Sequence, residues 1–498
     1  MGKKLTVYFT SDVHGFLFPT DYATRCPKPM GVLGEIAQFH KDGNTLILDG
    51  GDTLQGSPLT YYYHLQQGPC PLARALNEGG YDFVTLGNHD FNYGPQALGD
   101  YLRALKAKCL CANVEAPGLP IAPWAIRTMA NGLRVGIVGI VTNWVNRWEN
   151  PANLVGICVK EPLAAARAAL AAMKTQVDFT ICLYHGGYER DLVTGRSLSD
   201  SDENIACKIC EELDFDLMLM GHQHLAVAEA SWHGVHMVQT PANATHFAKI
   251  EVSDEGTIHS QLIPAAVVDC SAYEKEYNAV ESWLDRPIGS LDRPLLPSDK
   301  VDMALHGSPI ADFFNQVQLE ASGADLSVTC LANDIRGFSQ QVTVRDVVAT
   351  YVYPNTLTVL EVDERALRAA LERCASYLNE DLTIARDFLE PKVAHYNYDF
   401  FSGIEYTFDL SKPVGSRVVR LTREGKPLRG TYRLAMNSYR ATGVGGYDIY
   451  AQCKRVREIQ KEISEMILDQ FVQKGHVVVR PSHAIHVIRS AIDGDRIC

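Results

Sequence analysis

Five short apolar runs in the first half of the chain each end in a cluster of polar residues. The runs LTVYFT, TLIL, FVTL, FTICLY and LMLM pass directly into SDVHG, DGGDT, GNHD, HGG and GHQH. Such runs are typical of strands buried on both faces of a sheet. Helical patterns lie between them, such as PLAAARAALAAMK over residues 162–174, where proline fits a helix start. The order predicts a layered α/β fold with its polar clusters at the carboxyl ends of strands, the edge where such folds bind ligands.

The polar clusters supply imidazole, carboxylate and amide side chains and contain no cysteine. Their residues are Asp12, His14, Asp52, Asn88, His89, Asp90, His185, His222 and His224. This set of donors suits zinc, manganese or iron better than a thiolate-rich structural site does. In DVH and HQH the candidate ligands are two residues apart, which places both on the same side of an extended segment. The clusters therefore predict a metal centre at this edge of the fold.

Composition and charge narrow the classes of function. A length of 498 residues predicts two domains, and the net charge of −13 disfavours binding to a nucleic-acid polymer. No run of 18 apolar residues is present, so no membrane span is expected. Thirteen scattered cysteines and the absence of a signal-peptide pattern predict a cytoplasmic protein, although a trimmed secreted protein would look the same. The sequence does not indicate an oligomeric state.

The spacing CKIC, Cys207 to Cys210, is the one cysteine pattern that could point to redox or zinc chemistry. It has no second pair at a zinc-finger distance, and NIACKICEEL has the period of an amphipathic helix. We expect both cysteines to lie on the buried side of that helix.

The motifs SDVHG, GGDT, GNHDF, HGG and GHQH, in this order, resemble those of the calcineurin-like metallophosphoesterases. The similarity extends to the 5′-nucleotidases and covers nearly the whole chain. It implies an αββα four-layer sandwich, an α+β 5′-nucleotidase C-terminal domain and two divalent metal ions. It implies that His89 contacts the phosphate or protonates the leaving oxygen. Carried over by position, one metal would be held by Asp12, His14 and His224, the other by Asn88, His185 and His222, with Asp52 bridging them.

Position 92 departs from the pattern of the 5′-nucleotidase branch. That branch typically has Asp three residues after the histidine that matches His89, whereas this chain has Asn92. An amide can orient the imidazole ring but cannot match the effect of a carboxylate on its pKa. The pattern GNHxFNYG instead resembles the bacterial 2′,3′-cyclic-nucleotide 2′-phosphodiesterase/3′-nucleotidase branch. We therefore expect a phosphoric ester hydrolase that favours 2′,3′-cyclic or 3′-nucleotides, with 5′-nucleotidase or UDP-sugar hydrolase activity as the alternative.

The sequence changes in character after residue 265. A charged helical pattern, AYEKEYNAVESWL, is followed by the proline-rich DRPIGSLDRPLLPSD. We predict a catalytic domain over residues 1–265, a helical connector over 266–287 and a substrate-binding domain over 288–498. Within the last, YDFFSGIEYTFDLSKPVGSRVVRLTREGKPL has the alternation and turn residues of antiparallel hairpins. No cluster of metal ligands occurs in this half of the sequence.

Two loops of the second half carry candidate base-binding tyrosines. TYVYPNTL contains Tyr353 and Asn355, and NSYRATGVGGYDIY contains Tyr447 behind a glycine pair. Rings on such loops can sandwich a base, although each can equally pack in a core with its hydroxyl satisfied. Both loops resemble those that supply the base-stacking aromatics of 5′-nucleotidases, and Arg336 in LANDIRGF matches a substrate-binding arginine there.

Two other classes of protein share part of this pattern. A protein phosphatase would use the same metals but would have little use for tyrosines on a second domain. A non-catalytic nucleotide sensor would keep the tyrosines but should have lost metal ligands, and none is missing from this sequence. The enzyme hypothesis with a nucleotide substrate accounts for both halves of the chain.

Overall fold

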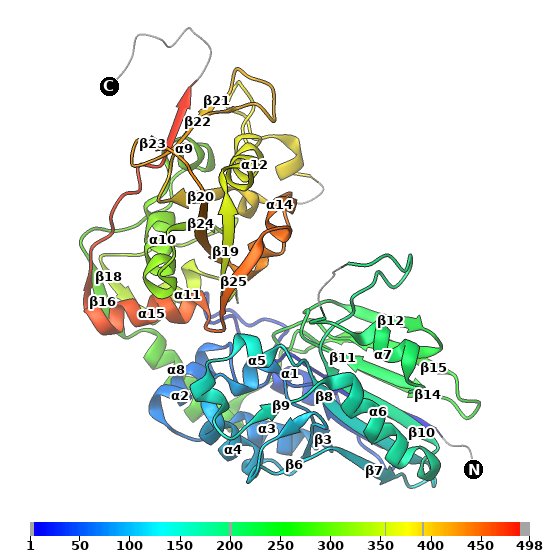
Figure 1. Cartoon of the computed structure of the whole chain (residues 1–498). Coiled ribbons are helices and arrows are strands. Elements are labelled where there is room, and N and C mark those ends of the chain that lie inside the picture. The colour runs from blue at the N-terminus through cyan, green and yellow to red at the C-terminus, as the bar shows by residue number, and fades with distance from the viewer. Residues whose placement is uncertain (1–3, 199–201, 354, 391–392, 489–498) are drawn as a thin grey trace. The chain divides into compact units, whose positions relative to one another are not determined.

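The computed structural model describes residues 4–198, 202–353, 355–390 and 393–488. It divides the chain into two compact units, Met1–Glu281 and Ser282–Cys498 (Figure 1). The division falls inside helix α8 (Glu274–Leu284), which lies within the segment predicted as a connector.

The first unit contains two large sheets. The order of the seven-stranded sheet is β15-β14-β1-β2-β3-β4-β6, and that of the six-stranded sheet is β12-β13-β11-β10-β8-β7. Strands β1 to β4 are parallel to their neighbours within that group, as are β8, β10, β11 and β13 in the other sheet. The strands of the first sheet are β1 (Leu5–Thr10), β2 (Thr45–Asp49), β3 (Phe83–Val84), β4 (Lys108–Leu110), β6 (Ile121–Ala122), β14 (His246–Val252) and β15 (Ile258–Pro264). Those of the second are β7 (Trp124–Thr128), β8 (Arg134–Val141), β10 (Phe179–His185), β11 (Leu217–Met220), β12 (Val227–Trp232) and β13 (Val235–Gln239).

Alternate residues of the predicted apolar runs face different cores. Val7 and Phe9 of β1 pack between the two sheets, together with Ile181 and Leu183 of β10. Tyr8 belongs instead to the core on the outer face of the first sheet. Both faces of each central strand are therefore covered, which explains why the runs are apolar without alternation.

Helices cover the outer faces of both sheets. The outer core of the first sheet includes residues of α3 (Leu72–Gly79) and α4 (Gly94–Ala104). The outer core of the second includes residues of α6 (Pro162–Met173) and α7 (Ala206–Glu212), and Cys207 and Cys210 are buried in α7. These layers form the predicted αββα sandwich, and both the helix at 162 and the buried cysteine helix are confirmed. The remaining elements of this unit are α1 (Val32–Ile36), α2 (Pro58–Gln66), α5 (Val145–Trp148), β5 (Val114–Glu115) and β9 (Cys158–Val159).

The second unit is α+β. A five-stranded sheet has the order β20-β17-β24-β19-β25, and a four-stranded sheet has the order β23-β22-β21-β27. Strands β21, β22 and β23 form the predicted antiparallel hairpins, whereas β20 pairs with β17. A third sheet has the order β18-β16-β26. The strands are β16 (Pro287–Leu291), β17 (Leu326–Cys330), β18 (Gln341–Thr343), β19 (Leu357–Asp363), β20 (Asp399–Ser402), β21 (Glu405–Asp409), β22 (Val418–Arg423), β23 (Lys426–Pro427), β24 (Thr431–Asn437), β25 (Lys454–Ile459), β26 (His476–Val477) and β27 (Ile485–Ile488).

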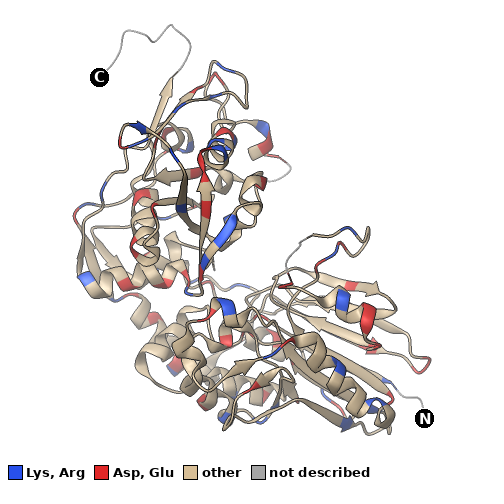
Figure 2. Ribbon diagram, viewed as in Figure 1, with Lys and Arg blue, Asp and Glu red and all other residues tan. Residues whose placement is uncertain are grey.

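Helix α10 lies against β17 and α15 in this unit. The helices of the unit are α9 (Lys300–His306), α10 (Pro309–Ser322), α11 (Val344–Thr350), α12 (Glu364–Ala375), α13 (Ser438–Ala441), α14 (Asp448–Ala451) and α15 (Ile463–Lys474). Lys and Arg are interspersed with Asp and Glu over each unit (Figure 2). Among the described residues, no helix combines the length and the apolar character that a membrane crossing requires.

Candidate metal centre

The loops that follow β1, β2 and β11, together with the last residue of β10, bring the predicted ligands together. Asp12, His14 and His224 form one group, and Asp12, Asp52 and His185 form a second, with the ligand atoms of each group within 4.8 Å of one another. The Nε2 atoms of His14 and His224 are 3.0 Å apart. Asp52 Oδ2 lies 3.1 Å from His185 Nε2. Because Asp12 belongs to both groups, the two candidate sites are adjacent.

The two remaining predicted ligands contact each other beside the second group. Asn88 Oδ1 lies 2.9 Å from His222 Nδ1. The ring of His222 is 5.7 Å from that of His185, between centroids. The backbone N–H of His222 donates to Asp12 Oδ1 at 2.9 Å, which ties the loop after β11 to the loop after β1. All seven predicted ligands thus lie in one cluster.

The backbone of this cluster is strained. Left-handed φ angles are uncommon outside glycine and cost on the order of 1–3 kcal/mol each, and they gather at functional sites. Such angles occur at five of the seven predicted ligands: Asp12 (54°), His14 (46°), Asp52 (56°), His222 (75°) and His224 (57°). The fold therefore maintains costly backbone conformations where the side chains converge.

Asp90 fixes the loop that carries Asp52. Its carboxylate is buried and accepts hydrogen bonds from the backbone N–H groups of Gly87, Asp52, Thr53 and Leu54, at 2.8 to 2.9 Å. This role explains the third residue of the Asn-His-Asp sequence, which is structural and does not belong to the ligand cluster.

Three of the histidines are oriented by acceptors outside the cluster. His14 Nδ1 lies 2.9 Å from the carbonyl oxygen of Gln55, and His185 Nδ1 lies 2.7 Å from that of Gly50. His222 Nε2 lies 2.9 Å from Glu203 Oε1. An acceptor at one ring nitrogen leaves the other nitrogen to face the cluster, which is the usual arrangement behind metal-binding histidines. The sequence contained no signal for Glu203, which is 19 residues from His222.

The electrostatics of the cluster favour cation binding. Burial raises the pKa of the Asp12 carboxyl, but His185 and His224 outweigh burial and bring that pKa to about 2. Burial and the neighbouring His224 lower the pKa of His14 to about 4. At neutral pH Asp12 is therefore ionised and His14 neutral, the forms in which both residues bind metals.

Two atoms of the cluster are buried without any hydrogen bond. They are Asp52 Oδ2 and His185 Nε2, which face each other. Burial lowers the pKa of His185, but the charges of Asp52 and Asp12 dominate and raise it to about 10. Neither atom makes a well-directed hydrogen bond, and such buried polar atoms are costly. A divalent cation that displaced the His185 proton would coordinate both atoms, so the residues present fit a metal centre.

His89 lies beside the cluster. Its side chain belongs to neither of the two groups of candidate ligands. The backbone N–H of His89 donates to Asp52 Oδ1 at 2.7 Å, and its ring packs edge-on against that of His14, 5.3 Å between centroids. Asn92 Oδ1 lies 2.7 Å from Nδ1 of His89. The amide oxygen of Asn92 is therefore placed to orient the ring.

In the second unit, the ring of Tyr353 is partly exposed, whereas that of Tyr447 is buried. Tyr353 is 36% exposed, and its ring meets that of Tyr396 edge-on at 6.3 Å. Tyr447 is only 1% exposed because it stacks on Tyr450, and its hydroxyl donates to the carbonyl oxygen of Asn397 at 2.8 Å. The prediction that Tyr447 stacks on a base is wrong for this structure.

The other two residues predicted to bind substrate are Arg336 and Asn355. Arg336 is exposed, and Asn355 is half-buried with its backbone N–H bonded to the carbonyl oxygen of Tyr353 at 2.8 Å. Two further tyrosines of this unit are Tyr396, whose ring meets that of Tyr353, and Tyr439, which is 44% exposed in α13.

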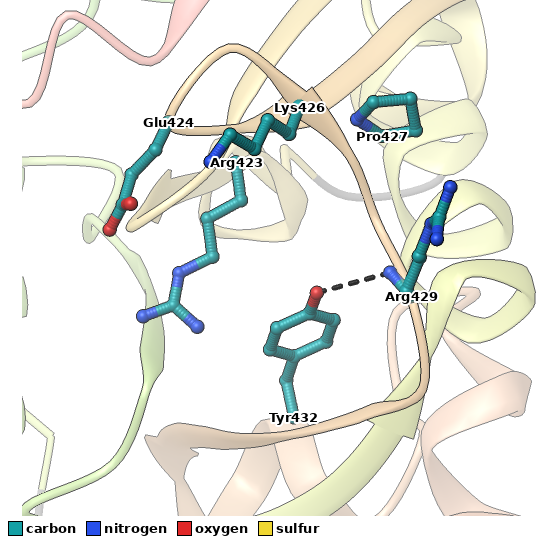
Figure 3. A pocket seen from close by; sticks show the side chains of 6 residues that line it. All are labelled: Arg423, Glu424, Lys426, Pro427, Arg429 and Tyr432. Atoms are coloured by element: carbon teal, nitrogen blue, oxygen red, sulfur yellow. Dashed lines mark hydrogen bonds between the residues drawn. The ribbon is translucent and has the colours of Figure 1, made fainter.

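A pocket of about 470 Å³ lies elsewhere in the second unit (Figure 3). Its rim includes Arg423, Lys426 and Arg429, and the backbone N–H of Arg429 donates to the hydroxyl of Tyr432 at 3.1 Å. None of the residues predicted from the sequence lines it. It is therefore separate from Tyr353 within that unit.

The sandwich fold and the cluster of histidine, carboxylate and amide ligands define a metal-dependent phosphoesterase. The family model for the calcineurin-like phosphoesterases matches residues 5–226, and that for the 5′-nucleotidase C-terminal domain matches residues 287–452. The chain belongs to the calcineurin-like phosphoesterases that carry a 5′-nucleotidase C-terminal domain. Members of this family are hydrolases that act on phosphoric esters with a dinuclear divalent metal centre.

Several relatives resemble the chain over different shares of its length. A candidate 5′-nucleotidase from Staphylococcus aureus, solved with α-ketoglutarate, is 31% identical, with 97% of this chain and 99% of that chain covered and a TM-score of 0.73. The 2′,3′-cyclic-nucleotide 2′-phosphodiesterase/3′-nucleotidase of Haemophilus influenzae is 24% identical over 88% of this chain and 80% of its own length. The 5′-nucleotidase of Rattus norvegicus is 32% identical over 40% of this chain and 36% of its own.

Proposed function

We propose that this chain is a dinuclear-metal nucleotide phosphohydrolase that prefers 2′,3′-cyclic nucleotides and 3′-nucleotides. The observation that carries the preference is the contact between His89 and Asn92, where the 5′-nucleotidase branch typically has a carboxylate. The long match to a relative named for this activity supports it as well.

The first unit supplies the residues that would hold the metals. The assignment places one ion on Asp12, His14 and His224, a second on Asn88, His185 and His222, and Asp52 between them. A pair of zinc, manganese or iron ions supplies Lewis acidity toward a phosphate and lowers the pKa of water. The left-handed ligand loops keep the donor atoms converged before substrate arrives, which reduces the reorganisation needed during the reaction.

His89 would act on the substrate directly. Its ring stands next to the cluster and is held at Nδ1 by Asn92, so that Nε2 is the nitrogen available to the phosphate or the leaving oxygen. In the second unit Tyr353 is the predicted ring that offers an exposed face to a base, and a base stacked on it contributes about 1–3 kcal/mol.

A 5′-nucleotidase is the second candidate, because the Staphylococcus aureus and Rattus norvegicus relatives carry that name. Purified protein supplied with Mn²⁺ or Zn²⁺ should be assayed against 2′,3′-cyclic AMP, 3′-AMP, 5′-AMP and UDP-glucose. We expect the highest kcat/KM for the first two. A clear preference for 5′-AMP would favour the second candidate, and one for UDP-glucose would favour the UDP-sugar hydrolases.

A further inference from the structure

The amide of Asn92 is itself held by a buried carboxylate. Asn92 Nδ2 donates to Glu149 Oε2 at 2.5 Å, while Asn92 Oδ1 faces His89 Nδ1 at 2.7 Å. Glu149 is 7% exposed and is 57 residues from Asn92 in the sequence. A chain of three side chains therefore runs from the protein interior to the ring beside the metal cluster.

Glu149 is fixed by hydrogen bonds of its own. Its Oε1 accepts from the backbone N–H of Asn150 at 2.7 Å and from the side-chain amide of Asn153 at 2.9 Å. Asn153 also donates to the carbonyl oxygen of Asn92 at 2.8 Å. Both oxygens of Glu149 thus act as acceptors in a closed network that includes the backbone of residue 92.

Trp148, the residue before Glu149, packs against the candidate metal cluster. Trp148, at the end of α5, is buried and stacks on His222 with ring centroids 5.4 Å apart and planes 23° apart. Consecutive side chains of one short helical segment therefore contact a candidate ligand and the support of His89.

The orientation of an asparagine amide follows from its neighbours. A carboxylate accepts hydrogen bonds and cannot donate them, so the NH₂ group of Asn92 must point to Glu149. The carbonyl oxygen of Asn92 then points to His89, and Nδ1 of His89 must carry the hydrogen. Nε2 is left facing away from Asn92.

We propose that Glu149 is a positioning residue for phosphoester hydrolysis, which sets the amide orientation of Asn92 and through it the ring tautomer of His89. The proposal rests on the proposed function for its effect on catalysis. It assigns to the pair Asn92 and Glu149 the role that a single carboxylate fulfils in the 5′-nucleotidase branch.

The substitution Glu149→Gln separates this role from support of the fold. The Gln oxygen still accepts from Asn150 and Asn153, but its NH₂ group now faces Asn92. The Asn92 amide should turn over and present its NH₂ to His89, which moves the ring hydrogen to Nε2. We expect kcat to fall about 10-fold or more, the size seen when outer-shell partners are lost, with KM and bound metal nearly unchanged.

A second substitution provides the rescue. Asn92→Asp alone places two carboxylates against each other and should also lower kcat. In the double variant Asn92→Asp with Glu149→Gln, the Gln NH₂ donates to the new carboxylate at position 92, which again accepts from His89. We expect the double variant to exceed both single variants in kcat, a coupling that independent sites do not show. Glu161→Gln is the matched control, because Glu161 accepts two backbone N–H bonds at the start of α6 and is remote from Asn92 in these contacts.

The tautomer is read without any activity measurement. Zinc-loaded protein with ¹⁵N-labelled histidine is examined by long-range ¹H–¹⁵N NMR, with the His89 signals identified by their loss in His89→Ala. We expect the Nδ1–H form in the unmutated protein and the double variant, and the Nε2–H form in Glu149→Gln.

An unchanged tautomer in Glu149→Gln, or a double variant no better than the weaker single variant, would overturn the proposal. Rates are measured on p-nitrophenyl phosphate as well as on the nucleotides. A failure on nucleotides by every variant and the unmutated protein would count against the proposed function, while the NMR result would still decide the role of Glu149.

Discussion

At the scale of single residues, the candidate centre stands out by the backbone its ligands adopt. Five of the seven candidate ligands have left-handed φ angles, and a buried carboxylate, Asp90, holds the loop of one of them, Asp52, with three of its four backbone hydrogen bonds. Such strain persists only where the surroundings determine the conformation. The fold therefore fixes the backbone on which these side chains converge.

Substitution of His89 distinguishes a metal ligand from a residue that acts on the substrate. We predict that His89→Ala lowers kcat by on the order of 10²–10³, the usual cost of losing one positioned donor. Bound metal should remain near the unmutated level, because the His89 ring is not among the ligand groups. Metal analysis of the purified variant checks this, and a large loss of metal would identify His89 as a ligand.

Asp49 makes stability depend on pH. It is fully buried at the end of β2 and accepts from the hydroxyls of Thr10 and Thr53. Burial outweighs these bonds and raises its pKa from 3.8 to about 7. Below about pH 4 the carboxyl is protonated in both the folded and the unfolded states, so it imposes no penalty. Between about pH 4 and 7 the unfolded state loses this proton first, and folding stability falls as pH rises.

The substitution Asp49→Asn removes this titration. We compare the urea concentration at the midpoint of unfolding between the variant and the unmutated protein. We predict that this midpoint increases for the variant, relative to the unmutated protein, as the pH rises from about 5 to about 7.5. Urea unfolding of both proteins at several pH values checks this. A midpoint difference that is the same at every pH would contradict it.

At the scale of elements, the strand ends were the most predictable part of the molecule. Buried parallel strands are continuous apolar runs, and their carboxyl ends meet at one edge, so local sequence alone brought Asp12, Asp52 and His185 together. Glu149 and Glu203 could not be found in this way, because each meets its partner across a large sequence separation without a local pattern. Tyr447 was misjudged because loop spacing does not tell which ring of a loop turns inward.

Substitution of Tyr353 should reduce nucleotide turnover, whereas substitution of Tyr447 should reduce stability. We predict that Tyr353→Ala lowers turnover of a nucleotide far more than that of an aryl phosphate, because an exposed ring supplies binding remote from the reacting phosphorus. Tyr447→Ala should instead destabilise the second unit by about 3–5 kcal/mol, the cost of deleting a buried aromatic ring.

Steady-state rates on both substrates and thermal unfolding of both variants check these expectations. Equal losses on the two substrates for Tyr353→Ala would remove it from the base site. If Tyr447→Ala has normal stability but a selective loss of turnover on nucleotides, Tyr447 belongs to the base-binding site.

At the scale of the whole molecule, we assign different functions to the two units. Every group of candidate metal ligands found among the described residues lies in the first unit, and the exposed tyrosines lie in the second. The family assignment rests on both units, because separate models match each of them. We infer that the first unit would hold two ions, with Asp52 in contact with both.

Anomalous diffraction from crystals grown with Mn²⁺ locates the ions and so tests this inference. We expect two manganese peaks, one beside Asp12, His14 and His224 and one beside Asn88, His185 and His222, with Asp52 in contact with both. Crystals of Asp52→Asn should show at least one peak weakened, because the bridge is lost. A single peak in the unmutated protein, or two peaks without Asp52 between them, would contradict the dinuclear centre.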